Sequence, residues 1–203
     1  DQADVSLRSV SGNAVRMTSN LTRAFEDKEI RKMAASYDEL SQAQGALYSL
    51  TRQYSMATDD ERLAMTRTAI AAKRFGITFD TTATITDKAF RVFGITGPEM
   101  MNRLYNSAAA IGETPVRMTK NFIETMDIMS QYSVPRAIQV LQGLSAIAKT
   151  TGIEMGTLTS IAARFDTFED AASNVAKLNA ILGGAYFNSI RMLNATESER
   201  LYL

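Results

Sequence analysis

Start and stop signals for α-helices recur at short intervals along this sequence and leave little room for any other element. A Ser or Thr precedes an acidic residue by three positions, the pattern of a capping box, at Ser36/Glu39, Thr58/Glu61, Thr96/Glu99, Thr167/Asp170 and Thr196/Glu199. Glycines that can end a helix in the left-handed conformation follow apolar-periodic segments at positions 76, 94, 112, 152 and 183–184. The sequence therefore predicts an all-α fold of short helices.

These signals predict the helix boundaries. Helices are expected at 13–35, 37–56, 59–75, 87–93, 98–111, 115–132, 135–150, 154–164, 168–182 and 185–194, and from 197 onward. Segment 77–85 is rich in Thr and β-branched residues, and we interpret it as a connecting loop because no second strand is evident. The expected architecture is an irregular array or bundle of short helices, preceded by one or two longer helices that can form a coiled coil. We accordingly divide the chain into an arm at 1–58, suited to oligomerisation, and a compact multi-helix domain at 59–203.

The composition excludes enzyme chemistry that depends on His or Cys and leaves carboxylate chemistry, a lysine nucleophile or the binding of hard cations by oxygens. The 203 residues include no His and no Cys, so the chain has no imidazole base, catalytic triad, cysteine nucleophile, disulfide or thiolate metal site. The two acidic clusters that could form a metal site or a general-acid pair, Asp59-Asp60-Glu61 and Glu169-Asp170, fall in the first turns of expected helices. Acids there complement the positive helix end, and neighbours on a helix point about 100° apart. We expect no catalytic residue, no metal site and no cofactor.

The charge balance and the hydropathy of the chain argue against two classes of partner, nucleic acids and membranes. The 22 Lys and Arg residues balance 22 Asp and Glu residues, which argues against direct nucleic-acid binding because phosphate affinity needs a surplus of cations. No apolar run approaches the roughly 20 residues that cross a bilayer, so this segment is not expected to enter a membrane. Other proteins are the expected partners.

An apolar stripe on the expected helices at 33–54 offers one place for such a partner. Its members recur every three or four residues after a first step of seven: Met33, Leu40, Ala43, Leu47, Leu50 and Tyr54. Polar residues flank the stripe, as expected for a coiled-coil seam between chains. A seam inside a bundle of the same chain fits the pattern equally well.

The C-terminal third carries a second, more distinctive pattern. A Phe-Asp-Thr-Phe helix start is followed by a Leu-Asn-x-x-Leu-Gly-Gly helix end, and then by an acidic helix that carries Arg200. The motif residues are Phe165, Asp166, Thr167, Phe168, Leu178, Asn179, Leu182, Gly183 and Gly184. This tract resembles the conserved helical segment of tail tape measure proteins, and of related large virion structural proteins, of contractile-tailed bacteriophages. The residues suit packing: Thr167 can cap a helix, and the two glycines allow a close turn.

The resemblance implies a structural virion protein in the phage tail, inside the tube or near the baseplate. Such a protein occupies the tail tube, sets tail length, binds the baseplate hub and leaves during DNA ejection. Its partners would be the tube and hub proteins and further copies of itself, with a trimer favoured by the symmetry of the lumen. The alternative is a helical protein–protein interaction domain of another virion protein, from the neck or interior, or of a bacterial secretion or signalling protein. Because the chain begins without Met and ends within a helical pattern, we expect it to be a segment of a longer polypeptide.

Overall fold

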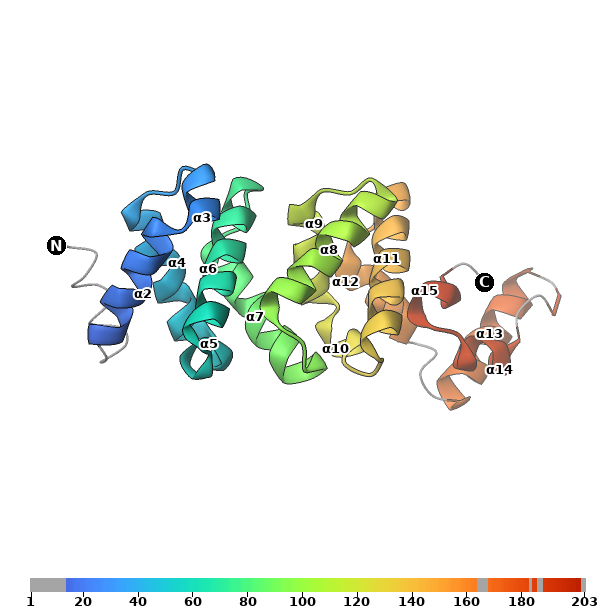
Figure 1. Cartoon of the computed structure of the whole chain (residues 1–203). Coiled ribbons are helices and arrows are strands. Elements are labelled where there is room, and N and C mark those ends of the chain that lie inside the picture. The colour runs from blue at the N-terminus through green and yellow to red at the C-terminus, as the bar shows by residue number, and fades with distance from the viewer. Residues whose placement is uncertain (1–13, 164–167, 183, 186–187, 202–203) are drawn as a thin grey trace. The chain divides into compact units, whose positions relative to one another are not determined.

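A computed structural model describes residues 14–163, 168–182, 184–185 and 188–201, and every regular element among them is an α-helix (Figure 1). The predicted all-α helical array is therefore confirmed. The chain forms two compact units: unit 1 comprises Asp1–Asn106 and Thr114–Thr119, and unit 2 comprises Ser107–Glu113 and Lys120–Leu203. The domain boundary predicted at 58/59 falls inside unit 1.

Unit 1 is built around one central helix, α4 (Tyr37–Leu50), which packs against α2 (Ala14–Glu26), α6 (Asp59–Arg74) and α7 (Phe79–Phe93). Two short helices, α3 (Lys28–Lys32) and α5 (Arg52–Met56), connect these longer ones. The buried core takes side chains from all of them, including Leu21, Ile30, Leu40, Leu47, Tyr54, Met65, Ile70 and Phe79. Helix α8 (Gly97–Ile111) begins in unit 1 and ends in unit 2.

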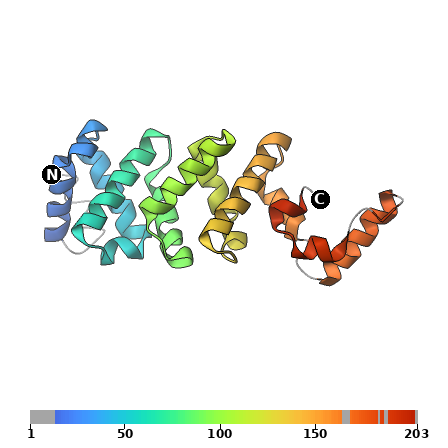
Figure 2. The ribbon, with the colours of Figure 1, turned by 45° about the vertical axis from the view of Figure 1, so that its right-hand side comes forward.

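Unit 2 is organised around α11 (Val134–Thr151), which packs against α10 (Met126–Met129), α12 (Met155–Ala163) and α15 (Glu197–Arg200). Helix α9 (Pro115–Glu124) begins in unit 1 and ends in unit 2. The core beside α11 contains Val140, Leu144, Ile147, Ala148, Met155 and Leu158. Helices α13 (Phe168–Leu182) and α14 (Ser189–Asn194) pack on each other through a separate small cluster around Val175 and Met192 (Figure 2).

Most of the predicted helix signals act as expected where the structure describes them, whereas Thr96 and Glu99 form only half of the predicted capping box because the Glu99 carboxylate accepts from Arg103. Ser36, Thr58 and Thr196 each form a complete capping box with the acid three residues later. The amide of Glu99 donates to Oγ1 of Thr96. The glycines at 76, 94, 112 and 152 have φ angles of 85°, 66°, 65° and 72°, the left-handed region that ends a helix. The pair Thr167/Asp170 and Gly183 lie outside the described residues or side chains.

The two longer helices predicted at the N-terminal end are each interrupted. Asp27 starts a new helix after α2, because its carboxylate accepts from the amides of Glu29 and Ile30. Thr51, in an extended conformation, likewise separates α4 from α5 and accepts from the amide of Tyr54. The resulting helices have 13, 5, 14 and 5 residues, and so none exceeds the 18-residue α11. An extended coiled-coil arm is therefore absent from residues 14–58.

The loop predicted over 77–85 was wrong for most of its length, because residues 79–85 form the first half of α7. Thr78 caps the helix by accepting from the amide of Thr81. The hydroxyls of Thr82 and Thr86 donate to carbonyls four residues earlier, which satisfies both groups inside the helix. The buried face of α7 repeats with helical spacing and packs on α4 and α6. Tertiary burial thus outweighs the low helix propensity of β-branched residues.

One close contact in unit 1 gives a test of this packing. A Cβ added at Gly97 would lie 2.3 Å from Oγ1 and 2.8 Å from Cβ of Thr86, an atom that the α7 backbone holds in place. We expect Gly97→Ala to destabilise the chain by about 1–3 kcal/mol through overpacking. Gly45→Ala is the matched control, because nothing lies within 4 Å of its added methyl group. It should be stabilising by up to about 1 kcal/mol through helix propensity. Thermal melts of both variants measure the difference, and equal melting temperatures would contradict it.

Candidate functional site

The apolar stripe predicted at 33–54 lies inside unit 1. Leu40, Ala43, Leu47 and Tyr54 are at most 1% exposed and form part of the unit's own core, with Met33 packed against them. Leu50 is the exception, because 44% of its surface is exposed. The stripe is therefore a seam within the bundle, the second of the two arrangements that the sequence allowed, and its buried members present no surface to another chain.

Tyr54 is the most polar member of the stripe, and its hydroxyl is satisfied inside the core. The hydroxyl oxygens of Tyr54 and Thr66 lie 3.1 Å apart. Since the Thr66 hydroxyl donates to the Arg62 carbonyl at 2.8 Å, the Tyr54 hydroxyl acts as donor to Thr66. Burial raises the pKa of Tyr54 well above its usual value, so the phenol stays protonated. The ring also makes an edge-on contact with Tyr48, at 4.7 Å between centroids.

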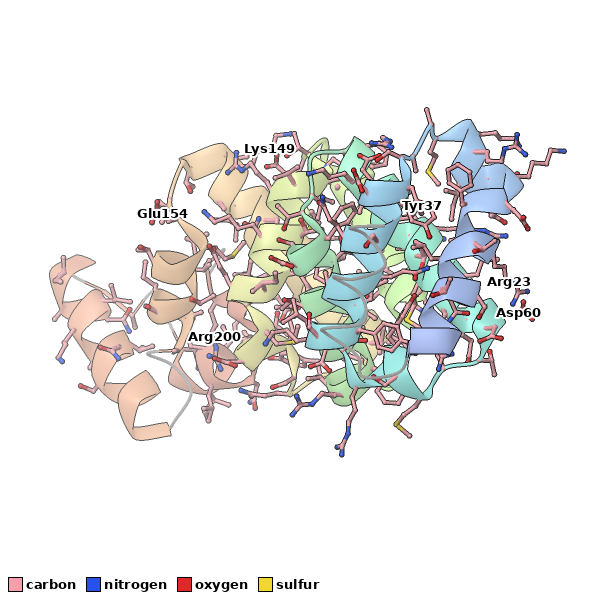
Figure 3. The ribbon with its side chains drawn as sticks, turned by 90° about the vertical axis from the view of Figure 1, so that its left-hand side faces the viewer. Arg23, Tyr37, Asp60, Lys149, Glu154 and Arg200 are labelled. Carbon is pink, nitrogen blue, oxygen red and sulfur yellow. The ribbon has the colours of Figure 1, made fainter. Side chains whose placement is uncertain are left out.

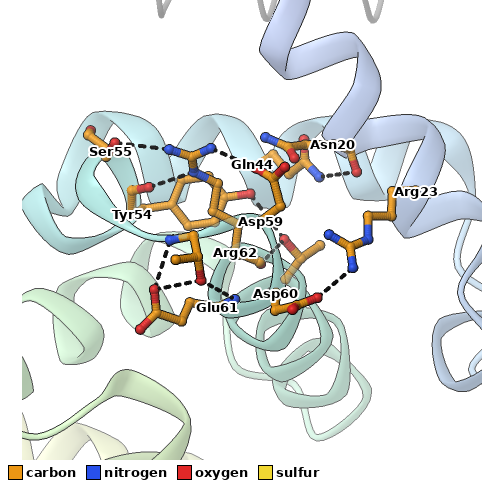
Figure 4. A network of polar contacts seen from close by, with 11 residues as sticks. Asn20, Arg23, Gln44, Tyr54, Ser55, Asp59, Asp60, Glu61 and Arg62 are labelled. Atoms are coloured by element: carbon orange, nitrogen blue, oxygen red, sulfur yellow. Dashed lines mark hydrogen bonds and ion pairs between the residues drawn. The ribbon is translucent and has the colours of Figure 1, made fainter.

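Arg62 is the hub of a polar network at the corner between α5 and α6 (Figure 4). The residue is only 6% exposed. Its Nε donates to the Tyr54 carbonyl and its Nη2 to the Ser55 carbonyl, both at 3.0 Å. Its Nη1 donates to the Asp59 carboxylate at 3.1 Å. The guanidinium thus satisfies two carbonyls in the last turn of α5 that the helix itself leaves without partners.

The acidic cluster Asp59-Asp60-Glu61 lies in the first turn of α6, where the sequence placed it, and each of its carboxylates has a partner of its own. Asp59 pairs with Arg62, Asp60 with Arg23 of α2, and Glu61 closes the capping box on Thr58 (Figures 3 and 4). The backbone and side-chain hydrogen bonds from Thr58 lower the pKa of Glu61. The three carboxylates therefore point to different partners and do not converge on a shared ligand. Among the residues that the structure describes, no group of three acidic side chains could hold a metal ion.

Two further ion pairs join helices of unit 1. Nε and Nη2 of Arg67, in α6, donate to the two carboxylate oxygens of Asp27, the residue that caps the start of α3. Arg74, at the end of α6, donates to both oxygens of Glu39 at 2.9 and 2.8 Å and to the Met33 carbonyl at 3.0 Å. The Arg74 guanidinium lowers the pKa of Glu39 to about 2. Glu39 therefore both caps α4 and ties it to α6.

The resemblance motif is only partly described. Residues 165, 166, 167 and 183 lie outside the described residues, and the side chains of Phe168 and Leu182, which begin and end α13, are not described. Leu178 is partly buried against the small cluster of α13 and α14. The amide of Gly184 donates to the carbonyl of Asn179 at 3.1 Å, five residues earlier, which is the bond of a Schellman helix end. The described part of the motif therefore ends and packs a helix.

A hollow of about 390 Å³ lies on the surface of unit 1. It is lined by Leu50, Thr84, Asp87, Lys88, Arg91 and Val92. The apolar side chains of Leu50 and Val92 are about two-fifths exposed, and Arg91 donates to Asp87 at 3.3 Å. This mixture of apolar and charged groups suits contact with a protein surface. Within the described part of the chain, no helix is both long and apolar enough to cross a membrane.

If the apolar stripe packs inside unit 1, truncation of Leu47 and truncation of Leu50 should differ in their effect on stability. Leu47→Ala opens a cavity in the core of unit 1 and should destabilise it by about 2–5 kcal/mol. Leu50→Ala removes a side chain that is already largely exposed, and should change stability by less than about 0.5 kcal/mol. Chemical denaturation of the two variants measures these effects. A seam between chains would instead make both truncations weaken self-association, which light scattering would detect.

The Glu39–Arg74 pair predicts a pH dependence of stability. Because the folded state lowers the pKa of Glu39 from 4.5 to about 2, its contribution is complete above pH 4.5 and is lost as the pH falls toward 2. Glu39→Gln should therefore be less stable than wild type near pH 6, and the gap should close toward pH 2. Glu99→Gln is the control, because Glu99 pairs with Arg103 inside α8 and joins no two helices. A gap for Glu39→Gln that stays constant with pH would contradict the assignment.

No protein-family model, no curated protein and no solved structure matches this chain. A functional assignment therefore depends on the residues of the chain itself and on the resemblance in its C-terminal third.

Proposed function

We propose that this chain is a structural segment of a tail tape measure protein of a contractile-tailed bacteriophage. In this role it lies in the tail, contacts the tube and the baseplate hub, takes part in setting tail length and leaves when DNA is ejected. The proposal rests on the resemblance of the tract from Ile147 to Arg200 and on the use that the chain makes of its polar residues. The expectation of a trimer rests on the resemblance, as it does at the level of the sequence; the stripe adds no support for self-association, because most of its members are buried in unit 1.

The observation that best supports a structural role is that many charged side chains cap helices or form ion pairs between them. Glu39, Glu61 and Glu199 close capping boxes. Arg67 and Arg74 join helices of unit 1 through bidentate ion pairs with carboxylates, and Arg136 joins α11 to Glu199 of α15 in unit 2. These groups serve helix ends and helix packing. A protein that must keep a defined helical structure within an assembly needs this use of charge.

Within a tape measure protein, this segment suits an anchor better than a ruler. A ruler spans distance at about 1.5 Å per residue only where its helix is continuous. Here the described helices have at most 18 residues, and α4 of unit 1 and α11 of unit 2 each pack against several neighbours. We therefore assign the segment to an attachment point on the tube or hub, and the measuring role to other parts of the protein.

Mass spectrometry of purified phage particles tests the proposal. Peptides from this chain should be found in intact particles and in isolated tails, and should be lost from particles that have ejected their DNA. Peptides of the tail-tube protein are the control, because they remain in the particle in both states. Peptides that stay with the capsid or neck would favour the alternative virion protein. Absence from particles would favour a bacterial secretion or signalling protein and would exclude the proposal.

A further inference from the structure

Two short stretches of the chain, one in each unit, have nearly the same sequence. Residues 57–63 read Ala-Thr-Asp-Asp-Glu-Arg-Leu and residues 195–201 read Ala-Thr-Glu-Ser-Glu-Arg-Leu, so five of the seven positions are identical. Each stretch follows a short helix, α5 in unit 1 and α14 in unit 2, and opens the next helix. Upstream in the sequence, Leu40, Gly45 and Tyr48 match Leu178, Gly183 and Tyr186 at the same separation in the chain.

The backbone at the two stretches follows the same path. Ala57 has φ −70° and ψ 154°, and Ala195 has φ −76° and ψ 150°. The next residues agree equally well: Thr58 has φ −67° and ψ 165°, and Thr196 has φ −70° and ψ 163°. In each capping box the glutamate oxygen accepts from the Thr amide and from the Thr hydroxyl, all at 2.8 Å. Two extended residues and one capping box thus make the same corner twice.

The arginine that follows each capping box makes the same two long-range bonds. Arg62 donates from Nε to the carbonyl eight residues earlier and from Nη2 to the carbonyl seven residues earlier, at 3.0 Å each. Arg200 repeats this pattern, with Nε to Met192 at 2.8 Å and Nη2 to Leu193 at 3.1 Å. Arg62 is 6% exposed and Arg200 9% exposed. Figure 3 labels Arg200, and Figure 4 shows the bonds of Arg62.

The physical requirement for this arginine follows from the way the preceding helix ends. Helices α5 and α14 end on an extended Ala without a left-handed glycine, so their last carbonyls lack the usual partners from a Schellman turn. A buried carbonyl without a partner is costly. The planar guanidinium has several N–H groups in a fixed fork, and two of them reach adjacent carbonyls at once. The arginine therefore does the work of a C-terminal cap from the first turn of the following helix.

We infer that the chain contains a duplicated αα-corner, and that Arg62 and Arg200 are the equivalent residues that lock its two copies. The copies differ in the third bond of the arginine. In unit 1, Nη1 of Arg62 binds Asp59 of its own helix. In unit 2, Nη1 of Arg200 binds the carbonyl of Ala162 at 2.9 Å and so also fixes the end of α12. The second copy thus uses the same lock to attach one more helix.

Hydrogen exchange followed by mass spectrometry of the 203-residue chain tests the lock. Lysine keeps the charge but does not reproduce the fork, so we expect Arg62→Lys to speed exchange at 52–66 about tenfold or more. Arg200→Lys should do the same at 189–201 and, through Ala162, at the end of α12. In each variant the other corner keeps its protection and serves as the internal reference. Arg91→Lys is the matched control, because Arg91 is exposed and pairs only along its own helix with Asp87. Exchange at both corners that matches this control would overturn the inference.

A swap variant tests the equivalence of the copies separately from the arginine. The double substitution Asp59→Glu with Asp60→Ser gives residues 57–63 the sequence of residues 195–201. If the copies are equivalent, exchange at 52–66 stays within about threefold of wild type, because the Arg23–Asp60 ion pair that is lost is exposed and the change at Asp59 leaves the two carbonyl bonds of Arg62 in place. A loss of protection as large as that of Arg62→Lys would show that the two corners are not interchangeable.

Discussion

A chain divided into short helices has many helix ends, and the backbone amides and carbonyls at these ends need hydrogen-bond partners. The rest of the structure depends on how these partners are supplied. Each α-helix leaves its first four amides and last four carbonyls without internal partners. With helices as short as α3, α5 and α15, the ends amount to a large part of the backbone. Capping side chains bond many of the free amides, and glycines with positive φ allow the chain to turn back and bond the free carbonyls. Many polar side chains bond to helix ends, and the described acidic side chains do not form a cluster that could hold a metal ion.

The local part of this solution can be read from the sequence. A Ser or Thr that caps three residues ahead needs no information from elsewhere in the chain, which is why the boxes at 36, 58 and 196 were predictable. The glycines at 76, 94, 112 and 152 were predictable for the same reason, because a residue with positive φ strongly favours Gly. The all-α class and most helix positions follow from these local rules.

The remaining features depend on contacts that the sequence does not display. Segment 77–85 has the composition of a loop or strand, and its burial against α4 and α6 makes it helical. The stripe from Met33 to Tyr54 has the spacing of a coiled coil, but α2, α6 and α7 cover it within unit 1. The role of Arg62 depends on carbonyls seven and eight residues earlier, and it is visible only once the corner is built. The near-identity of the two Ala-Thr-x-x-Glu-Arg-Leu stretches was the available signal for that role.

The order in which helices pack has a consequence for how the chain folds and unfolds. Some helices pack on the next helix in the sequence, as α6 does on α7 and α13 on α14, whereas the central α4 packs on α6 and α7 and so joins elements that are further apart in the chain. Contacts between near neighbours close short loops, which costs little chain entropy and gives fast folding. The pair α13 and α14, which packs mainly on itself, can therefore open locally while the core beside α11 stays folded.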